Sequence, residues 1–212
     1  QKTLSERCVV ETVIDDQVIT ITAYDGKGRI VQERIATYAP NGMSISIQGI
    51  SLTYYDEGPY AGNVHEQHII SYDPKNTSTI IDNQVIEIES YYSGGNDDGK
   101  AHVQKITTFN PNGTIKIDAQ KIEIESYYQG GKNNGKVHIQ KVITYNPTNE
   151  SDIVDAQKIE IKDYYYDGQD HGNVHIQKVT TYNPKDESIV VDEQELEIED
   201  YYYGGQNHGK VH

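Results

Sequence analysis

The sequence predicts an all-β fold made of tandem β-hairpin repeats of 36–37 residues, and three observations support this prediction. Gly-rich loops recur along the chain, β-branched segments alternate with them, and prolines punctuate the array at matching positions. The loops end on histidines spaced 37, 36, 37 and 37 residues apart, namely His65, His102, His138, His175 and His212. Such a period is typical of repeat architectures. We expect an elongated antiparallel meander or thin sandwich, with a β-solenoid as the alternative.

Each repeat contains two predicted strands. A short segment such as IQKVITYNP (139–147) ends at a proline, which cannot continue a hydrogen-bonded ladder. A longer segment such as TIKIDAQKIEIESYY (114–128) follows and alternates apolar with acidic residues. The chain holds five short segments of this kind and six long ones, the long ones near 13–22, 43–53, 80–90, 115–126, 152–163 and 189–200.

The long strands have a parity problem. Ile115 and Ile117 fall on odd positions, whereas Ile122 and Ile124 fall on even ones. Side chains alternate between the two faces of a strand, so a straight strand cannot place all four on one face. We therefore expect a bulge or corner near Asp118-Ala119-Gln120.

The array divides into three parts: an N-terminal segment (1–12), degenerate repeats (13–63) and regular repeats (64–212). It begins in the middle of a repeat, and its last repeat stops where another short strand is due. One long strand is therefore expected to lack a neighbour. Residues 4–14 are a candidate donor strand for head-to-tail self-association.

Composition restricts the partners. The chain has 33 acidic and 18 basic residues and a formal net charge of −15, which disfavours nucleic acid and anionic membranes. It has no apolar stretch near the roughly 20 residues that span a bilayer, so no membrane span is expected. The single Cys8 cannot form an internal disulfide; we expect a buried, inert thiol, with a free thiol or a disulfide to another chain as the alternatives.

Three glycosylation sequons occupy one position in successive repeats, just after the proline. Their acceptors are Asn76, Asn112 and Asn149. A surface turn is where a glycan can be attached, so the pattern favours an extracellular or cell-surface glycoprotein. The alternative is that asparagine serves here as an ordinary turn residue.

Tyrosine pairs precede the Gly-rich loops. Because neighbouring residues of a strand point to opposite faces, one member of each pair can pack inward while the other joins an exposed aromatic ladder. Such a ladder could stack on glycans or on other surface proteins, or it could only stiffen the sheet. The pairs are Tyr54-Tyr55, Tyr91-Tyr92, Tyr127-Tyr128, Tyr164-Tyr165 and Tyr201-Tyr202.

Charged side chains suggest ion pairs and a weaker metal hypothesis. Glutamates of the long strands are expected to face Lys105, Lys141 and Lys178 of the short strands across the sheet. No cofactor is expected, although carboxylates and histidines in the loops make calcium or a local chelate the alternative. The residues concerned are Asp97, Asp98, Asp167, Asp170, His171, His175, His208 and His212.

These observations favour a structural protein. The chain has no nucleophile–base–orienter set, and each notable histidine or carboxylate recurs in several repeats, so an enzyme is not expected. The leading hypothesis is an extracellular structural repeat protein that forms a filament or an adhesive stalk. The alternative is a multivalent module that binds carbohydrate or calcium.

Overall fold

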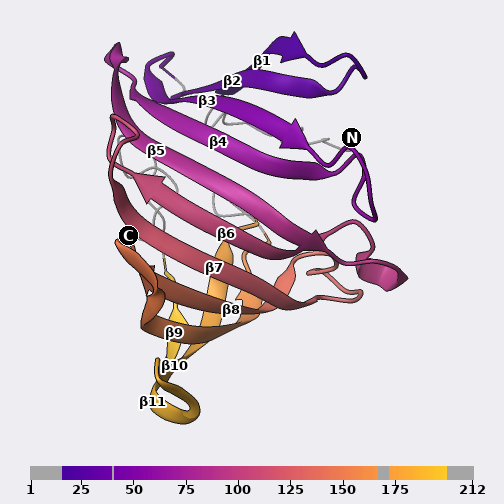
Figure 1. Ribbon diagram of the computed structural model, residues 1–212, viewed down its shortest axis with the longest axis vertical. Helices are drawn as coiled ribbons and strands as arrows, with labels where there is room; N and C mark the ends of the chain where they lie inside the picture. The colour runs from indigo at the N-terminus through magenta and orange to yellow at the C-terminus, as the bar shows by residue number, and fades with distance from the viewer. Residues whose placement is uncertain (1–15, 40, 167–171, 200–212) are drawn as a thin grey trace, which may run out of the picture.

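The computed structural model describes residues 16–39, 41–166 and 172–199, which form one open antiparallel sheet (Figure 1). Each strand pairs with its neighbours in the sequence, so the spatial order is the chain order. A 3₁₀ turn, η1 (Gly95–Asp97), lies in the loop after β5. The strands are β1 (Asp16–Tyr24), β2 (Ile30–Tyr38), β3 (Ser44–Tyr54), β4 (Val64–Asp73), β5 (Asn76–Tyr91), β6 (Ala101–Phe109), β7 (Lys116–Tyr127), β8 (Val137–Asn146), β9 (Asn149–Tyr164), β10 (Val174–Asn183) and β11 (Asp186–Glu197).

The predicted antiparallel meander is confirmed, and its single layer corresponds to neither a sandwich nor a solenoid. A solenoid would need parallel crossovers, whereas hairpin turns at Pro74, Pro147 and Pro184 reverse the chain within a few residues. No helix in the described part of the chain is long and apolar enough to cross a membrane.

The predicted bulge lies at Ile117. In the β6–β7 ladder, Thr108 pairs with Asp118 and Phe109 pairs with Lys116, which leaves Ile117 as the extra residue. Equivalent register shifts occur where β4 meets β5, β8 meets β9 and β10 meets β11. The bulge bends each long strand, as the change of parity required.

The core is thin and lies on both faces of the sheet. Ala119 is 0% exposed and Ile124 is 3% exposed. The β7–β8 register is continuous between them, so these two side chains, five residues apart, point to opposite faces. Ala156 and Ile161 repeat the arrangement in β9. Strands β7 and β9 therefore each bury one face near the hairpin turn and the other face near the tyrosines.

The sheet is strongly twisted. Figure 1 shows β9 to β11 running at a steep angle to β4 and β5, and the sheet curving rather than lying flat. A right-handed twist between neighbouring strands is intrinsic to L-amino acids, and the bulges increase it. The twist brings the turn of one repeat over the face of an earlier one.

Candidate functional site

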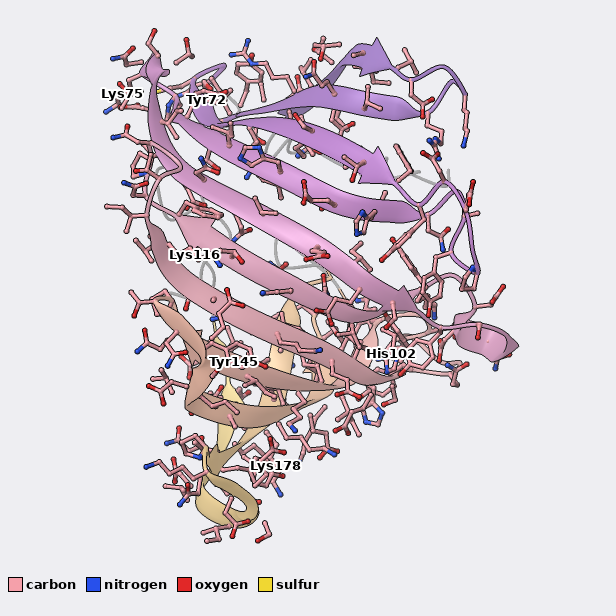
Figure 2. The ribbon with its side chains drawn as sticks, in the orientation of Figure 1. Tyr72, Lys75, His102, Lys116, Tyr145 and Lys178 are labelled. Atoms are coloured by element: carbon pink, nitrogen blue, oxygen red, sulfur yellow. The ribbon has the colours of Figure 1, made fainter. Side chains whose placement is uncertain are left out.

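The strands have two chemically different ends. We call the end that carries the Tyr pairs and Gly-rich loops the tyrosine end, and the end that carries the turns after the short strands the hairpin end. Figure 2 places His102 at the tyrosine end and Lys116 at the hairpin end. Candidate functional residues lie at both.

At the tyrosine end, each of the described Tyr pairs ties its strand to strands on both sides. The Tyr91 hydroxyl donates to the carbonyl of Val64 at 2.5 Å, and the Tyr92 hydroxyl donates to that of Ile124 at 2.5 Å. The pair thus connects β4, β5 and β7. The same bonds recur from Tyr54 to Ile30, Tyr55 to Ile88, Tyr127 to Ala101, Tyr128 to Ile161, Tyr164 to Val137 and Tyr165 to Ile198.

We predicted that one tyrosine of each pair forms an exposed ladder. This is wrong for the described pairs, because both of their tyrosines are half-buried or buried. Their hydroxyl groups satisfy strand-end carbonyls, which draws the rings down onto the sheet. Burial raises the pKa of Tyr127 and of Tyr164 to about 12. Tyr201 and Tyr202 lie outside the described residues.

Histidines stack on the second tyrosine of each described pair. The rings of Tyr92 and His102 have centroids 4.5 Å apart, and the contact recurs for Tyr55 with His65, Tyr128 with His138 and Tyr165 with His175. His102 Nε2 also lies 3.7 Å from Glu123 Oε1. These histidines therefore have aromatic partners in the sheet.

The metal hypothesis gains no support from the described residues, among which no group of three His, Cys, Asp or Glu side chains is placed to hold an ion. Asp97 instead accepts hydrogen bonds from Lys100 and Gln129, and Asp98 accepts one from the Gly94 amide. His175 lies between Asp163 and Glu197. Asp167, Asp170, His171, His208 and His212, like Cys8, lie outside the described residues.

At the hairpin end, ion pairs link repeats that are distant in the sequence. Lys105 Nζ lies 2.6 Å from Glu150, whose second oxygen lies 2.5 Å from Lys116. These hydrogen bonds lower the pKa of the Glu150 carboxyl to about 2. Lys141 pairs likewise with Glu187. Lys105 and Lys141 therefore make their ion pairs with residues at the start of a later long strand rather than with the glutamates opposite them in the ladder.

The three sequon asparagines occupy the hairpin end. Asn76 and Asn149 are the first residues of β5 and β9, and Asn112 lies in the turn between β6 and β7. All three are exposed. The side chain of Asn76 bonds Thr79, and that of Asn149 accepts a bond from the Ser151 amide. Their glycosylation remains a prediction.

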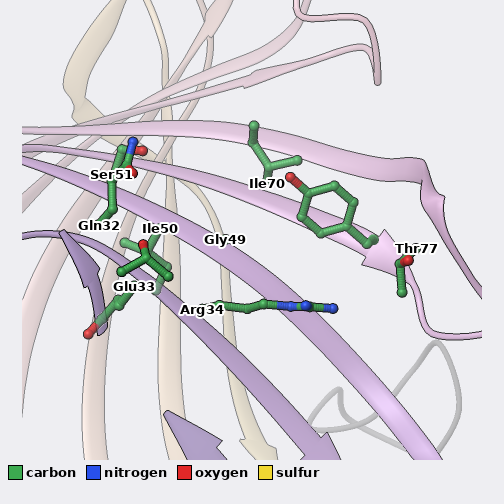
Figure 3. A pocket seen from close by; sticks show the side chains of 10 residues that line it. Gln32, Glu33, Arg34, Gly49, Ile50, Ser51, Ile70 and Thr77 are labelled. Atoms are coloured by element: carbon green, nitrogen blue, oxygen red, sulfur yellow. The ribbon is translucent and has the colours of Figure 1, made fainter. Parts of the chain in front are cut away.

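One open pocket of about 380 Å³ lies on the sheet over β1 to β5 (Figure 3). Its lining includes Arg34, Gly49, Tyr72 and Thr77. Sequence reasoning missed it. The available signal was that Gly49 and Thr77 are uncharged, whereas the corresponding residues around Lys105 and Lys141 are charged.

A comparison with protein-family models, with curated proteins and with solved structures found no match to this chain. The fold itself defines the class: an all-β repeat protein whose described strands form a single-layer antiparallel sheet.

Proposed function

We propose that this chain is an extracellular structural repeat protein that associates head-to-tail, through its edge strands, into a filament or an adhesive stalk. The observation that carries the proposal is the charge pattern along the long strands. Glu87 stands opposite Lys105 in the ladder, Glu123 opposite Lys141, and the β9 residue Glu160 opposite Lys178. Each of these long strands therefore faces a short strand that carries a lysine.

Strand β11 has a glutamate at the corresponding position, and this position faces the side of β11 away from β10. Glu197 occupies the position of Glu87 and Glu123, and within the described residues β11 pairs with β10 alone. All twelve of its residues are exposed. An edge strand with free N–H and C=O groups accepts a further strand. The complementary strand for this edge carries a cation opposite Glu197.

The sequence of residues 4–14 contains a cation at the required position. The run Leu4-Ser5-Glu6-Arg7 aligns with Val31-Gln32-Glu33-Arg34 of β2, and Arg7 falls at the position that lysine holds in later short strands. These residues lie outside the described part of the chain. In the proposed assembly they add to β11 of another copy, with Arg7 opposite Glu197. Repeated head-to-tail addition that does not close gives an open filament.

The extracellular location rests on the sequons at the hairpin end. Three acceptor asparagines at matching, exposed positions would carry glycans away from both the tyrosine end and the sheet edges. Filament growth through the edges would then leave the glycans accessible. Treatment of natively produced protein with a peptide N-glycosidase should reduce its mass; an unchanged mass contradicts this location.

Charge reversal tests the assembly. Deletion of residues 1–12 should convert oligomers to monomers in light scattering after size exclusion, and Arg7→Glu should do the same because Glu197 would then face a carboxylate. A Glu197→Lys change in the Arg7→Glu background should restore assembly. Lys185→Glu, at an exposed turn, makes the same charge change as a control. Oligomers that persist after the deletion would refute the proposal.

A further inference from the structure

We propose that the pocket beside Arg34 binds the carboxylate of an acidic sugar. The proposal is independent of filament assembly and rests on a comparison between equivalent positions of the repeats. Figure 3 shows Arg34 extending along the sheet within the pocket, with Ile70 and Thr77 on its rim. Three positions of this pocket differ from the corresponding positions around Lys105 and Lys141, and each difference favours an external anion.

The first position is the cation. Arg34 in β2 is equivalent to Lys105 in β6 and Lys141 in β8, because all three stand three residues after the start of the repeat marked by Val31, His102 and His138. Lys105 is held by Glu150, and Lys141 by Glu187. The Arg34 side chain is exposed and has no ion-pair or hydrogen-bond partner among the described residues.

The second position is the acid. Glu150 and Glu187 each stand three residues after the proline of their turn, at Pro147 and Pro184. The same position after Pro74 is Thr77, which lines the pocket. The turn therefore reaches the cation in this repeat as in the later ones, but it brings a hydroxyl group instead of a carboxylate.

The third position creates the space. The residue paired with Arg34 across the ladder is Gly49, whereas Lys121 stands opposite Lys105 and Lys158 opposite Lys141. A Cβ at Gly49 would lie 3.5 Å from the Tyr72 ring, an ordinary contact, so the glycine is not needed to avoid a clash. Its effect is to leave the floor of the pocket open.

The chemistry of the ligand follows from these positions. The equivalent cations Lys105 and Lys141 each bind a carboxylate, and a guanidinium binds carboxylates through two parallel hydrogen bonds. The uncharged polar lining, Gln32, Ser51 and Thr77, both donates and accepts hydrogen bonds, as sugar hydroxyls require. Tyr72 adds an aromatic ring, and about 380 Å³ accommodates one or two sugar rings. Glu33 also borders the pocket, but strand alternation directs its side chain to the other face.

The test is calorimetric titration of the whole chain with digalacturonate, with neutral digalactose and with acetylated glutamate amide. Digalacturonate should bind, digalactose should bind at least tenfold more weakly, and acetylated glutamate amide should bind more weakly than digalacturonate. Equal binding of the neutral sugar would refute the carboxylate requirement. Tighter binding of the amino-acid derivative would refute a sugar ligand, and no heat from digalacturonate at millimolar concentration would refute the site.

Variants locate the binding. Arg34→Gln should abolish digalacturonate binding, whereas Arg34→Lys should retain part of it. Thr77→Glu should lower the affinity for digalacturonate at least tenfold, because the new glutamate would form an ion pair with Arg34, as Glu150 does with Lys105. Gly49→Val, which copies the equivalent Val85, should fill the floor and weaken binding. Lys185→Gln is the control for loss of an exposed cation. Unchanged thermal unfolding verifies the fold of each variant, and unchanged affinity in Thr77→Glu would contradict the proposal.

Discussion

At the tyrosine end, Tyr164 is 7% exposed and its hydroxyl donates to a backbone carbonyl, whereas at the hairpin end Ile117 is 57% exposed and its strand is held by solvent-accessible ion pairs. Both ends belong to the same sheet. The difference shows that each region of a single-layer sheet is buried only by the side chains and turns that lie directly on it. Aromatic rings cover the sheet at one end, while the turns of other repeats cover it only partly at the other.

Truncation at the tyrosine end should have the largest effect. Tyr164→Ala removes a buried ring and the hydrogen bond to Val137, and we expect a loss of about 3 kcal/mol in the free energy of unfolding. Ile117→Ala at the hairpin end should cost only about 0.5 kcal/mol because the side chain is mostly in water. Urea denaturation of both variants measures the contrast, and similar losses would remove the distinction between the two ends.

Overpacking should destabilise a tightly packed position near the hairpin end. Ala119 is 0% exposed and stands between Thr107 and Tyr145 in the ladders. We expect Ala119→Leu to destabilise the chain by about 2 kcal/mol because the neighbouring side chains must move. Gln120→Leu, the next position on the opposite face, is the matched control. A neutral Ala119→Leu variant in thermal unfolding would show that this end is loosely packed throughout.

Alkaline pH should weaken the tyrosine end selectively. Burial raises the pKa of Tyr127 and Tyr164 to about 12 in the folded chain, from 10.0 for a free phenol. Their contribution is complete below pH 10 and is lost as pH rises towards 12, because the unfolded chain ionises first; we expect a loss on the order of 1 kcal/mol for each phenol. The Tyr127→Phe/Tyr164→Phe variant should show a smaller loss over this range; an identical pH profile would refute the assignment.

Acid should have the smallest effect, at the hairpin end. Ion pairing lowers the pKa of Glu150 to about 2 from 4.5, so its contribution is present above pH 4.5 and is lost as pH falls towards 2. The partly exposed pair limits the loss to less than about 1 kcal/mol. Glu150→Gln should reduce the slope of stability against pH in this window, as followed by circular dichroism. Glu125→Gln, which affects a different ion pair, is the comparison variant.

The strands and the bulge could be predicted because both depend on local pattern. The proline after each short strand and the parity change between Ile117 and Ile122 are visible in the sequence. The pairing of Lys105 with Glu150, which are 45 residues apart, could not be predicted because it depends on the accumulated twist of the sheet. The Arg34 pocket was missed for the same reason: its cation, its glycine and its threonine come from three strands.

The tyrosine hydroxyl bonds also affect how the array responds to load. Tyr92 reaches from the end of β5 to Ile124 of β7, past the intervening β6. A strand peeled from one side of such a sheet must break a tie to a strand beyond its immediate neighbour, so rupture cannot proceed one ladder at a time. Nearest-neighbour coupling in repeat arrays sets how far a local break spreads. Here the coupling extends further, and a pulled sheet should fail in larger cooperative segments than single hairpins.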